Sequence, residues 1–197
     1  MKKYMISALC LLSIGLSQKT IEGFPYSFEN KLAGTFETIE MPQIDVDALL
    51  EEDYNAAPGT PERYGKRFYV NYSLENSGSW EILPNGDKVW RLRIISKGAL
   101  AMSLYYDHYS IPGGARLFVY NESREMVYGA YSSLNNQEDG LFATPLMEGD
   151  VIILEYYEPR EVDFTGSIVI GMVIHDYKDL LNFSKQRSPS NRCGTNV

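Results

Sequence analysis

Short apolar and aromatic runs follow one another from Phe68 to Tyr177, and turn residues separate them. Hydrophobic and polar positions alternate within several of these runs, as in RFYVNYSL and VWRLRI, which is the period of a half-buried β-strand. No long stretch with the period of a helix interrupts the series. The pattern predicts about nine strands in an all-β, antiparallel sandwich of the jelly-roll type.

The clearest turn signal is the dipeptide Asn85-Gly86, which lies between the runs WEIL and KVWRLRII. Asn-Gly is the preferred centre of a two-residue hairpin, because both positions take a positive φ. Alternation along the following strand puts Trp90 and Leu92 on one side and Arg91 on the other. We therefore predict that Trp90 belongs to the core and is not a ligand-binding platform.

The 15 tyrosines include the adjacent pairs Tyr105-Tyr106 and Tyr156-Tyr157. One member of each pair must point outward from a strand, and an amphipathic phenol tolerates that position. We expect part of one sheet face to be an aromatic surface with an arginine rim, on which a partner docks. Its candidate residues are Arg91, Arg93, Tyr105 and Tyr157.

Residues 1–17 have the features of an export signal peptide. Lys2 and Lys3 precede an apolar run from Met5 to Leu16. This run is shorter than the roughly 20 residues of a membrane-spanning helix, and no later apolar stretch reaches that length. We expect a secreted or periplasmic protein without a membrane anchor.

Residues 18–60 mix acidic residues, prolines and glycines with little periodicity, so we predict a loosely packed acidic leader before a sandwich domain at residues 61–177. The segment IDVDALLEEDY is the exception, because its apolar residues could line one side of a short helix. Its carboxylates favour a solvated helix face. A calcium loop is the alternative, but the glycine and the ligand spacing of such a loop are missing.

The formal net charge is -8, and it becomes -10 when Lys2 and Lys3 leave with the signal peptide. An acidic protein is a poor partner for nucleic acid or anionic membranes, which bind clustered basic residues. The chain would then keep one cysteine, Cys193, which is the fifth residue from its end. In an oxidising compartment a lone thiol indicates an accidental surface cysteine, an intermolecular disulfide or a missing partner.

The sequence contains no recognisable catalytic or metal-binding motif. His108 and His175 each adjoin an aspartate, but neighbours on a strand point to opposite faces. There is no Gly-x-Ser-x-Gly elbow and no His-Glu-x-x-His site, and one cysteine with two separated histidines makes a poor zinc site. We expect no catalysis by this chain alone, no cofactor and no metal.

Several blocks resemble the amino-terminal pro-region of secreted bacterial lysyl endopeptidases and related trypsin-like serine proteases. They are NGDKVWRLRIISKGALAMSL, IPGGARLFVYN, EGDVIILEYYEP and IVIGMVIHDY, and the likeness covers roughly residues 58–197. The resemblance implies that residues 178–197 are a linker and the first residues of a protease domain. It also implies that Cys193 is the first cysteine of that domain and forms a disulfide within it. The family's catalytic residues have no counterpart in this chain.

The resemblance implies a pro-domain that assists folding of its own downstream protease domain and inhibits it until cleavage. All-β proteases with many non-local contacts fold slowly, so a native-like template would help them. Lys185 and Arg187 are candidate processing points, although they could equally be ordinary solvated charges. The alternative is a free-standing secreted sandwich that binds a glycan or a surface protein. A weaker third possibility is a device that keeps a periplasmic precursor soluble.

Overall fold

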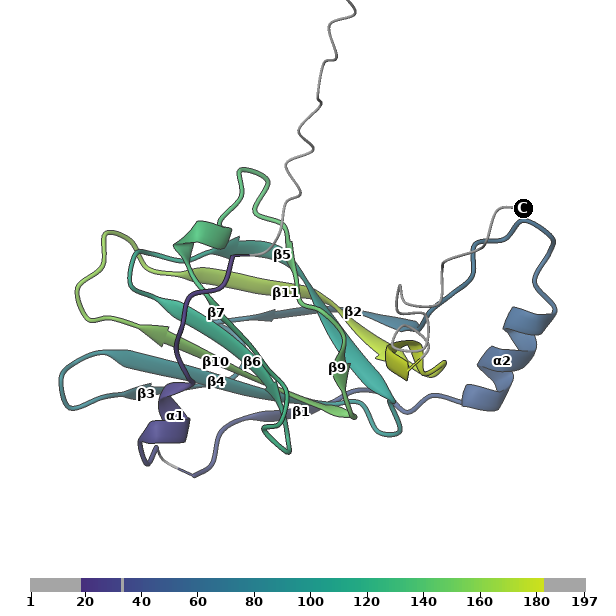
Figure 1. Ribbon diagram of the computed structural model, residues 1–197, viewed down its shortest axis with the longest axis horizontal. Helices are drawn as coiled ribbons and strands as arrows, with labels where there is room; N and C mark the ends of the chain where they lie inside the picture. Colours follow the sequence, from purple (N-terminus) through teal and green to yellow (C-terminus); the bar gives the residue numbers. More distant parts are fainter. Residues whose placement is uncertain (1–18, 33, 183–197) are drawn as a thin grey trace, which may run out of the picture.

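The computed structural model describes residues 19–32 and 34–182, and it is a two-layer β-sandwich with three short helical segments (Figure 1). Sheet A contains β1 (Thr38–Glu40), β3 (Ser79–Ile82), β4 (Lys88–Ile95), β6 (Arg116–Asn121), β7 (Val127–Tyr131) and β10 (Val151–Glu158). Sheet B contains β2 (Lys66–Ser73), β5 (Ala101–Ser110), β8 (Phe142–Ala143), β9 (Met147–Glu148) and β11 (Ser167–Asp176). The remaining elements are α1 (Tyr26–Glu29), α2 (Val46–Tyr54) and the 3-10 turn η1 (Ser133–Asn135).

The strand order confirms the predicted antiparallel sandwich and is that of a jelly roll. Sheet A runs β4-β10-β6-β7 and sheet B runs β2-β11-β5 with β8 and β9. The first main strand therefore pairs with the last, β2 with β11, and the next pairs are β4 with β10, β5 with β8 and β9, and β6 with β7. This nested pairing is what a long hairpin gives when it folds over into two sheets. The described chain has 11 strands, about two more than predicted, because β1 and β9 are only three and two residues long and leave little alternating pattern.

Alternation along the central strands fills the space between the sheets. Trp90 and Leu92 of β4 are buried and face the interior, as predicted, and the Trp90 indole N–H donates to the Ser77 carbonyl at 2.7 Å. Tyr106 of β5 and Tyr156 of β10 are the inward members of their tyrosine pairs, with 1% and 0% of their surfaces exposed. The core is thus aromatic as well as aliphatic, and it fixes which side of every strand faces solvent.

The Asn85-Gly86 hairpin forms, but its loop differs from the prediction. The Leu83 N–H donates to the Asp87 carbonyl and the Gly86 N–H donates back to Leu83, so three residues form the loop. Only Gly86 takes a positive φ, at 89°. Pro84 explains the difference, because its fixed φ suits the start of a type I turn, which then needs one glycine to close.

The predicted helix is present as α2, and Asp45 caps it by accepting the Ala48 N–H at 3.0 Å. Figure 1 shows α2 beyond one end of the two sheets. Asp53 attaches it there, through the Tyr177 hydroxyl, Arg63 and Lys178. The hydrogen bond from Lys178, with that from Tyr177, holds the pKa of Asp53 well below its usual range.

Residues 19–32 and 34–41 pack against sheet A, where the sequence predicted a loosely packed leader. β1 joins sheet A as a parallel partner of β4, and the Met41 N–H donates to the Ile95 carbonyl. At the opposite edge Ile21 exchanges two backbone hydrogen bonds with Ala130 of β7. The segment between these two attachments crosses sheet A and carries α1. We call the described residues of this segment, 19–32 and 34–41, the cover strap.

Candidate interaction surface

Tyrosines stand on the outer face of sheet B and make the principal candidate site. The register places Tyr69 of β2 opposite Met172 of β11, and Met172 opposite Tyr105 of β5. These three side chains form one row across three strands. Tyr69 is 76% exposed and Tyr105 is 40% exposed, which is unusual for large aromatic side chains.

Two further residues extend this row toward the start of β2. The Tyr64 hydroxyl lies 3.4 Å from the Tyr105 hydroxyl, and the Arg67 guanidinium lies 6.0 Å from the centre of the Tyr64 ring. The hydrogen bond to Tyr105, together with partial burial, raises the pKa of Tyr64. We call Tyr64, Arg67, Tyr69, Tyr105 and Met172 the tyrosine face.

A bulge in β11 sets the orientation of Met172. Between Ile170 and Met172, Gly171 is the extra residue relative to β5, where Tyr106 and Tyr105 are adjacent, whereas relative to β2 the extra residue lies on β2 between Tyr69 and Tyr72. A Cβ on Gly171 would collide with the Asp107 carboxylate, so a larger residue there would require the Asp107 side chain to move. Bulges change the direction of the side chains that follow them. Here the bulge returns Met172 to the outer face, beside Tyr69 and Tyr105.

The structure does not bring the four predicted surface residues together. Tyr105 lies on sheet B, whereas Arg91, Arg93 and Tyr157 lie on the outer face of sheet A. The prediction of one shared surface is wrong because alternation gives the side of a strand but not the sheet to which the strand belongs. A partner-binding role for any of these residues stays a prediction.

The outer face of sheet A is covered by the cover strap. Phe28 of α1 packs edge-on against Tyr120, with ring centres 4.9 Å apart, and Tyr26 stacks on Tyr157 at 6.1 Å. Burial, together with the hydrogen bond to Asp87, raises the pKa of Tyr157 to about 12, and burial raises that of Tyr120 to about 12. Neither tyrosine offers a free aromatic surface.

Glu155 is a buried carboxylate under the cover strap, with 0% of its surface exposed. Its carboxylate accepts the backbone N–H of Ser27 at 3.0 Å and the Tyr120 hydroxyl at 3.3 Å. A buried carboxylate needs such donors to offset lost hydration. The cover strap therefore supplies a polar partner as well as apolar cover.

The two histidines lie apart and in different environments. His108 is exposed on β5, while His175 at the end of β11 is 1% exposed, and its Nδ1 lies 2.8 Å from the Ser96 hydroxyl. Burial lowers the pKa of His175. A serine and a histidine at this distance have the spacing of a nucleophile and its base, but a substrate cannot reach a serine that is itself 1% exposed. Sequence reasoning missed the pair because its members are 79 residues apart.

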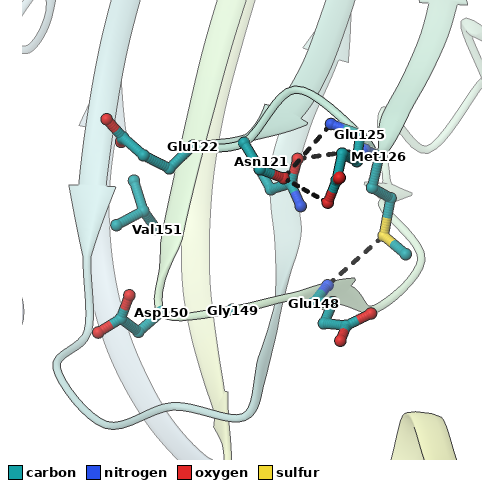
Figure 2. Close-up of a pocket in the computed structure, with 9 residues that line it drawn as sticks. Asn121, Glu122, Glu125, Met126, Glu148, Gly149, Asp150 and Val151 are labelled. Carbon is teal, nitrogen blue, oxygen red and sulfur yellow. Dashed lines mark hydrogen bonds between the residues drawn. The ribbon is translucent and has the colours of Figure 1, made fainter.

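An acidic hollow of about 440 Å³ lies between the β6–β7 turn and the β9–β10 turn. Figure 2 shows Glu122 and Asp150 along one side of it and Glu125 and Glu148 along the other. Metal ions need convergent ligands, and no group of three or more acidic, histidine or cysteine side chains within residues 19–32 and 34–182 is arranged to hold one. The four carboxylates do not make a metal centre.

Other predicted sites lie outside the described residues. They are the signal peptide at residues 1–17, the candidate processing points Lys185 and Arg187, and Cys193. Among the described residues, no helix has the length and apolar character needed to cross a membrane.

Comparisons with known proteins leave the geometry as the main guide to function. No family model matches the chain, and no solved structure matches it.

Proposed function

We propose that this chain is the non-catalytic pro-domain of a secreted serine endopeptidase precursor, and that it docks on its protease domain through the tyrosine face. In this role it assists folding of the protease and inhibits it until the connection is cut. The observation that carries the docking proposal is the asymmetry of the sandwich: the cover strap buries the outer face of sheet A, while Tyr69 and Tyr105 on sheet B remain exposed.

The chemistry of the tyrosine face suits a folded protein partner. Tyrosine and arginine are enriched at the centres of protein interfaces, and methionine adapts its shape to a partner surface. The row Tyr69, Met172 and Tyr105 stands on three neighbouring strands, so its backbone is rigid. A rigid aromatic row loses little entropy when it binds.

The blocks that carry the family resemblance support the same proposal. NGDKVWRLRII contains the end of the β3–β4 loop and all of β4, EGDVIILEYYEP contains β10, and IVIGMVIHDY contains most of β11. These strands lie at the centre of the two sheets, and β11 supplies Met172 to the tyrosine face. The resemblance therefore concerns the part of the chain that forms both the sandwich and the candidate surface.

A refolding experiment tests this proposal. A denatured lysyl endopeptidase of the resembled type is diluted into buffer with and without the chain, and recovered activity is measured after the chain has been removed by proteolysis. We expect the chain to raise the yield and to inhibit the native enzyme before its removal. The double variant Tyr69→Ala with Tyr105→Ala should weaken inhibition at least about tenfold, which corresponds to about 1.4 kcal/mol.

The matched control is Tyr54→Ala, since Tyr54 on α2 is 89% exposed but lies off the tyrosine face. It should behave like the unsubstituted chain. Equal refolding yields with and without the chain, together with no inhibition, would overturn the proposal. Saturable binding of an oligosaccharide that depends on Tyr69 and Tyr105 would instead favour the free-standing glycan-binding module.

A further inference from the structure

Strand β2 is the longest strand at an edge of either sheet. Sheet A ends at β7, which Ile21 of the cover strap pairs with, and at β3 and β1, which share the other side of β4 and have four and three residues. Sheet B ends at the two-residue strands β8 and β9 and, on its other side, at the eight-residue strand β2. β11 lies between β5 and β2 (Figure 1), and no described strand pairs with the far side of β2. An unpaired edge presents a row of backbone N–H and C=O groups to a partner.

The later part of this edge is closed, and its earlier part is open. The Asn76 side chain folds back on β2, where it donates to the Asn71 carbonyl at 3.0 Å and accepts the Ser73 N–H at 2.9 Å. The extra residue that β2 carries relative to β11 interrupts the ladder in the same part, and such bulges protect edges from uncontrolled pairing. No described residue outside β11 hydrogen-bonds to the backbone of residues 66–69. We call residues 66–69 the open edge.

The inward side chains of β2 are only partly covered. Phe68, Val70 and Tyr72 pack against the core but are half-buried. Inward residues of the central strands, such as Leu92 and Leu154, are fully buried. The sandwich therefore ends at β2 with an apolar row that a further strand would remove from water, and that burial favours binding.

The start of β2 is positively charged and has no acidic partner. Neither Lys66 nor Arg67 forms an ion pair with any residue in the described part of the chain. Arg67 stands instead beside the Tyr64 ring, on the outer side of the strand. The whole chain has a formal net charge of -8, so this local charge is opposite to the overall one and favours a carboxylate on the partner.

We propose that the open edge binds an extended segment of a partner protein, which adds a strand to sheet B. An extended backbone carries N–H and C=O groups at the spacing of this edge, so it is the natural complement. The segment has apolar residues at alternate positions, which cover Phe68, and an acidic residue beside Arg67. A second copy of this chain is a poorer partner, because β2 itself contains two cations and no carboxylate and each copy is acidic. The proposal does not require the partner to be a protease, so the refolding experiment can fail without affecting it.

Calorimetric titration of the full chain with capped synthetic peptides tests the proposal. The parent probe is Asp-Val-Thr-Val-Thr-Val-Asp, which alternates and is acidic at both ends, so it suits either strand direction. Two further probes carry N-methyl groups, on the valines in one and on the threonines in the other. An added strand uses the N–H groups of one edge only, so one methylated peptide should bind at least about tenfold more weakly and the other like the parent. No binding of the parent, or the same affinity for both methylated peptides, would overturn the proposal.

A charge exchange locates the site on β2. Arg67→Glu should weaken binding of the parent peptide at least about threefold and strengthen binding of a peptide with lysines in place of the aspartates. A folding defect cannot produce that gain. The matched control is Arg116→Glu, because Arg116 is an exposed arginine on β6 of sheet A and the substitution changes the net charge equally. If Arg67→Glu and Arg116→Glu behave alike, the peptide does not bind beside Arg67.

Hydrogen exchange distinguishes strand addition from docking of side chains alone. The parent peptide should slow exchange of alternate backbone amides within the open edge. The amides of β7, whose edge the cover strap already pairs with, should keep their rates. Unchanged exchange in the open edge at saturating peptide would rule out strand addition. If sedimentation shows that the chain without peptide forms a dimer that protects the same amides, the occupant is a second copy and the proposed partner segment is wrong.

Discussion

The two outer faces of the sandwich differ in what they contact. On sheet A, Tyr120 is 3% exposed because Phe28 of the cover strap packs on it, and Glu155 beneath the strap is fully buried. On sheet B, Tyr69 has a comparable strand position but is largely exposed. Both faces carry tyrosines at outward positions, so composition does not distinguish them. A sheet face with outward aromatic side chains is a candidate binding surface only when the rest of the chain leaves that face open.

The strap also explains why sheet A can carry polar groups at its centre. Glu155 and Arg91 stand opposite each other on β10 and β4. In solvent they would form an ordinary surface pair of small energetic value. Beneath the cover strap, the carboxylate also accepts the N–H of Ser27, 128 residues away in the sequence. The covered face is therefore part of the folded core in energetic terms, and the open face is not.

Truncation of one tyrosine on each face should affect stability very differently. Tyr120→Ala should lower the free energy of unfolding by about 3–5 kcal/mol, because it removes a buried ring and leaves Phe28 without its partner. Tyr69→Ala should change it by less than about 0.5 kcal/mol, because an exposed side chain contributes little. Urea unfolding followed by fluorescence measures both. Equal losses would show that the two faces are energetically alike.

The buried His175 should make the stability of the fold depend on pH. Burial lowers the pKa of His175, so the folded state disfavours the protonated ring more than the unfolded state does. Stability is then fully present above the ordinary histidine pKa of about 6.5 and is lost as the pH falls through the lower, folded-state value. The nearby carboxylates of Asp150 and Asp176 oppose this loss and reduce its size.

Unfolding measured between about pH 7 and pH 5 tests this expectation. His175→Gln should flatten the slope of stability against pH, whatever its effect on stability at neutral pH. His108→Gln is the matched control on the exposed part of β5 and should keep the slope of the unsubstituted chain. The same slope in His175→Gln as in the unsubstituted chain would assign the pH dependence to other groups.

Alternation in the sequence predicted most of the strands and the inward direction of Trp90, because burial on one side of a strand leaves a period of two. It could not predict the cover strap. Tyr26 and Phe28 follow no period, and their ring contacts are with Tyr157 and Tyr120, which lie about 130 and 90 residues later in the sequence. Local pattern carries no information about such distant partners.

The sequence predicted only part of the tyrosine face, because local pattern does not show which strands become neighbours. Tyr105 was found from its adjacent pair, and RFYVNYSL already showed that Tyr69 alternates with Phe68. Placing both on one surface requires knowing that β2 and β5 flank β11. Their row also depends on the bulge at Gly171, which no period reveals. Alternation in the sequence indicates which tyrosines point outward, and the strand order determines which of them are neighbours.

We expect only a small loss of stability from changes at Arg124, which lies in the β6–β7 turn and contacts Phe28 of the cover strap. Arg124 has a φ of 61°, a left-handed conformation that favours glycine, and its guanidinium lies 4.8 Å from the centre of the Phe28 ring. Arg124→Ala should lower the free energy of unfolding by about 0.5–1 kcal/mol, because it loses the cation–π contact and keeps the backbone strain.

Arg124→Gly loses the same contact but relieves the strain, so it should be about 1 kcal/mol more stable than Arg124→Ala and close to the unsubstituted chain. Urea unfolding of the three proteins measures the differences, and the alanine–glycine pair isolates the backbone contribution. If glycine were no better than alanine, the turn would not be strained. If alanine had no effect, the contact with Phe28 would contribute nothing to holding the strap, and the cover of sheet A would rest on Tyr120, Tyr157 and Glu155.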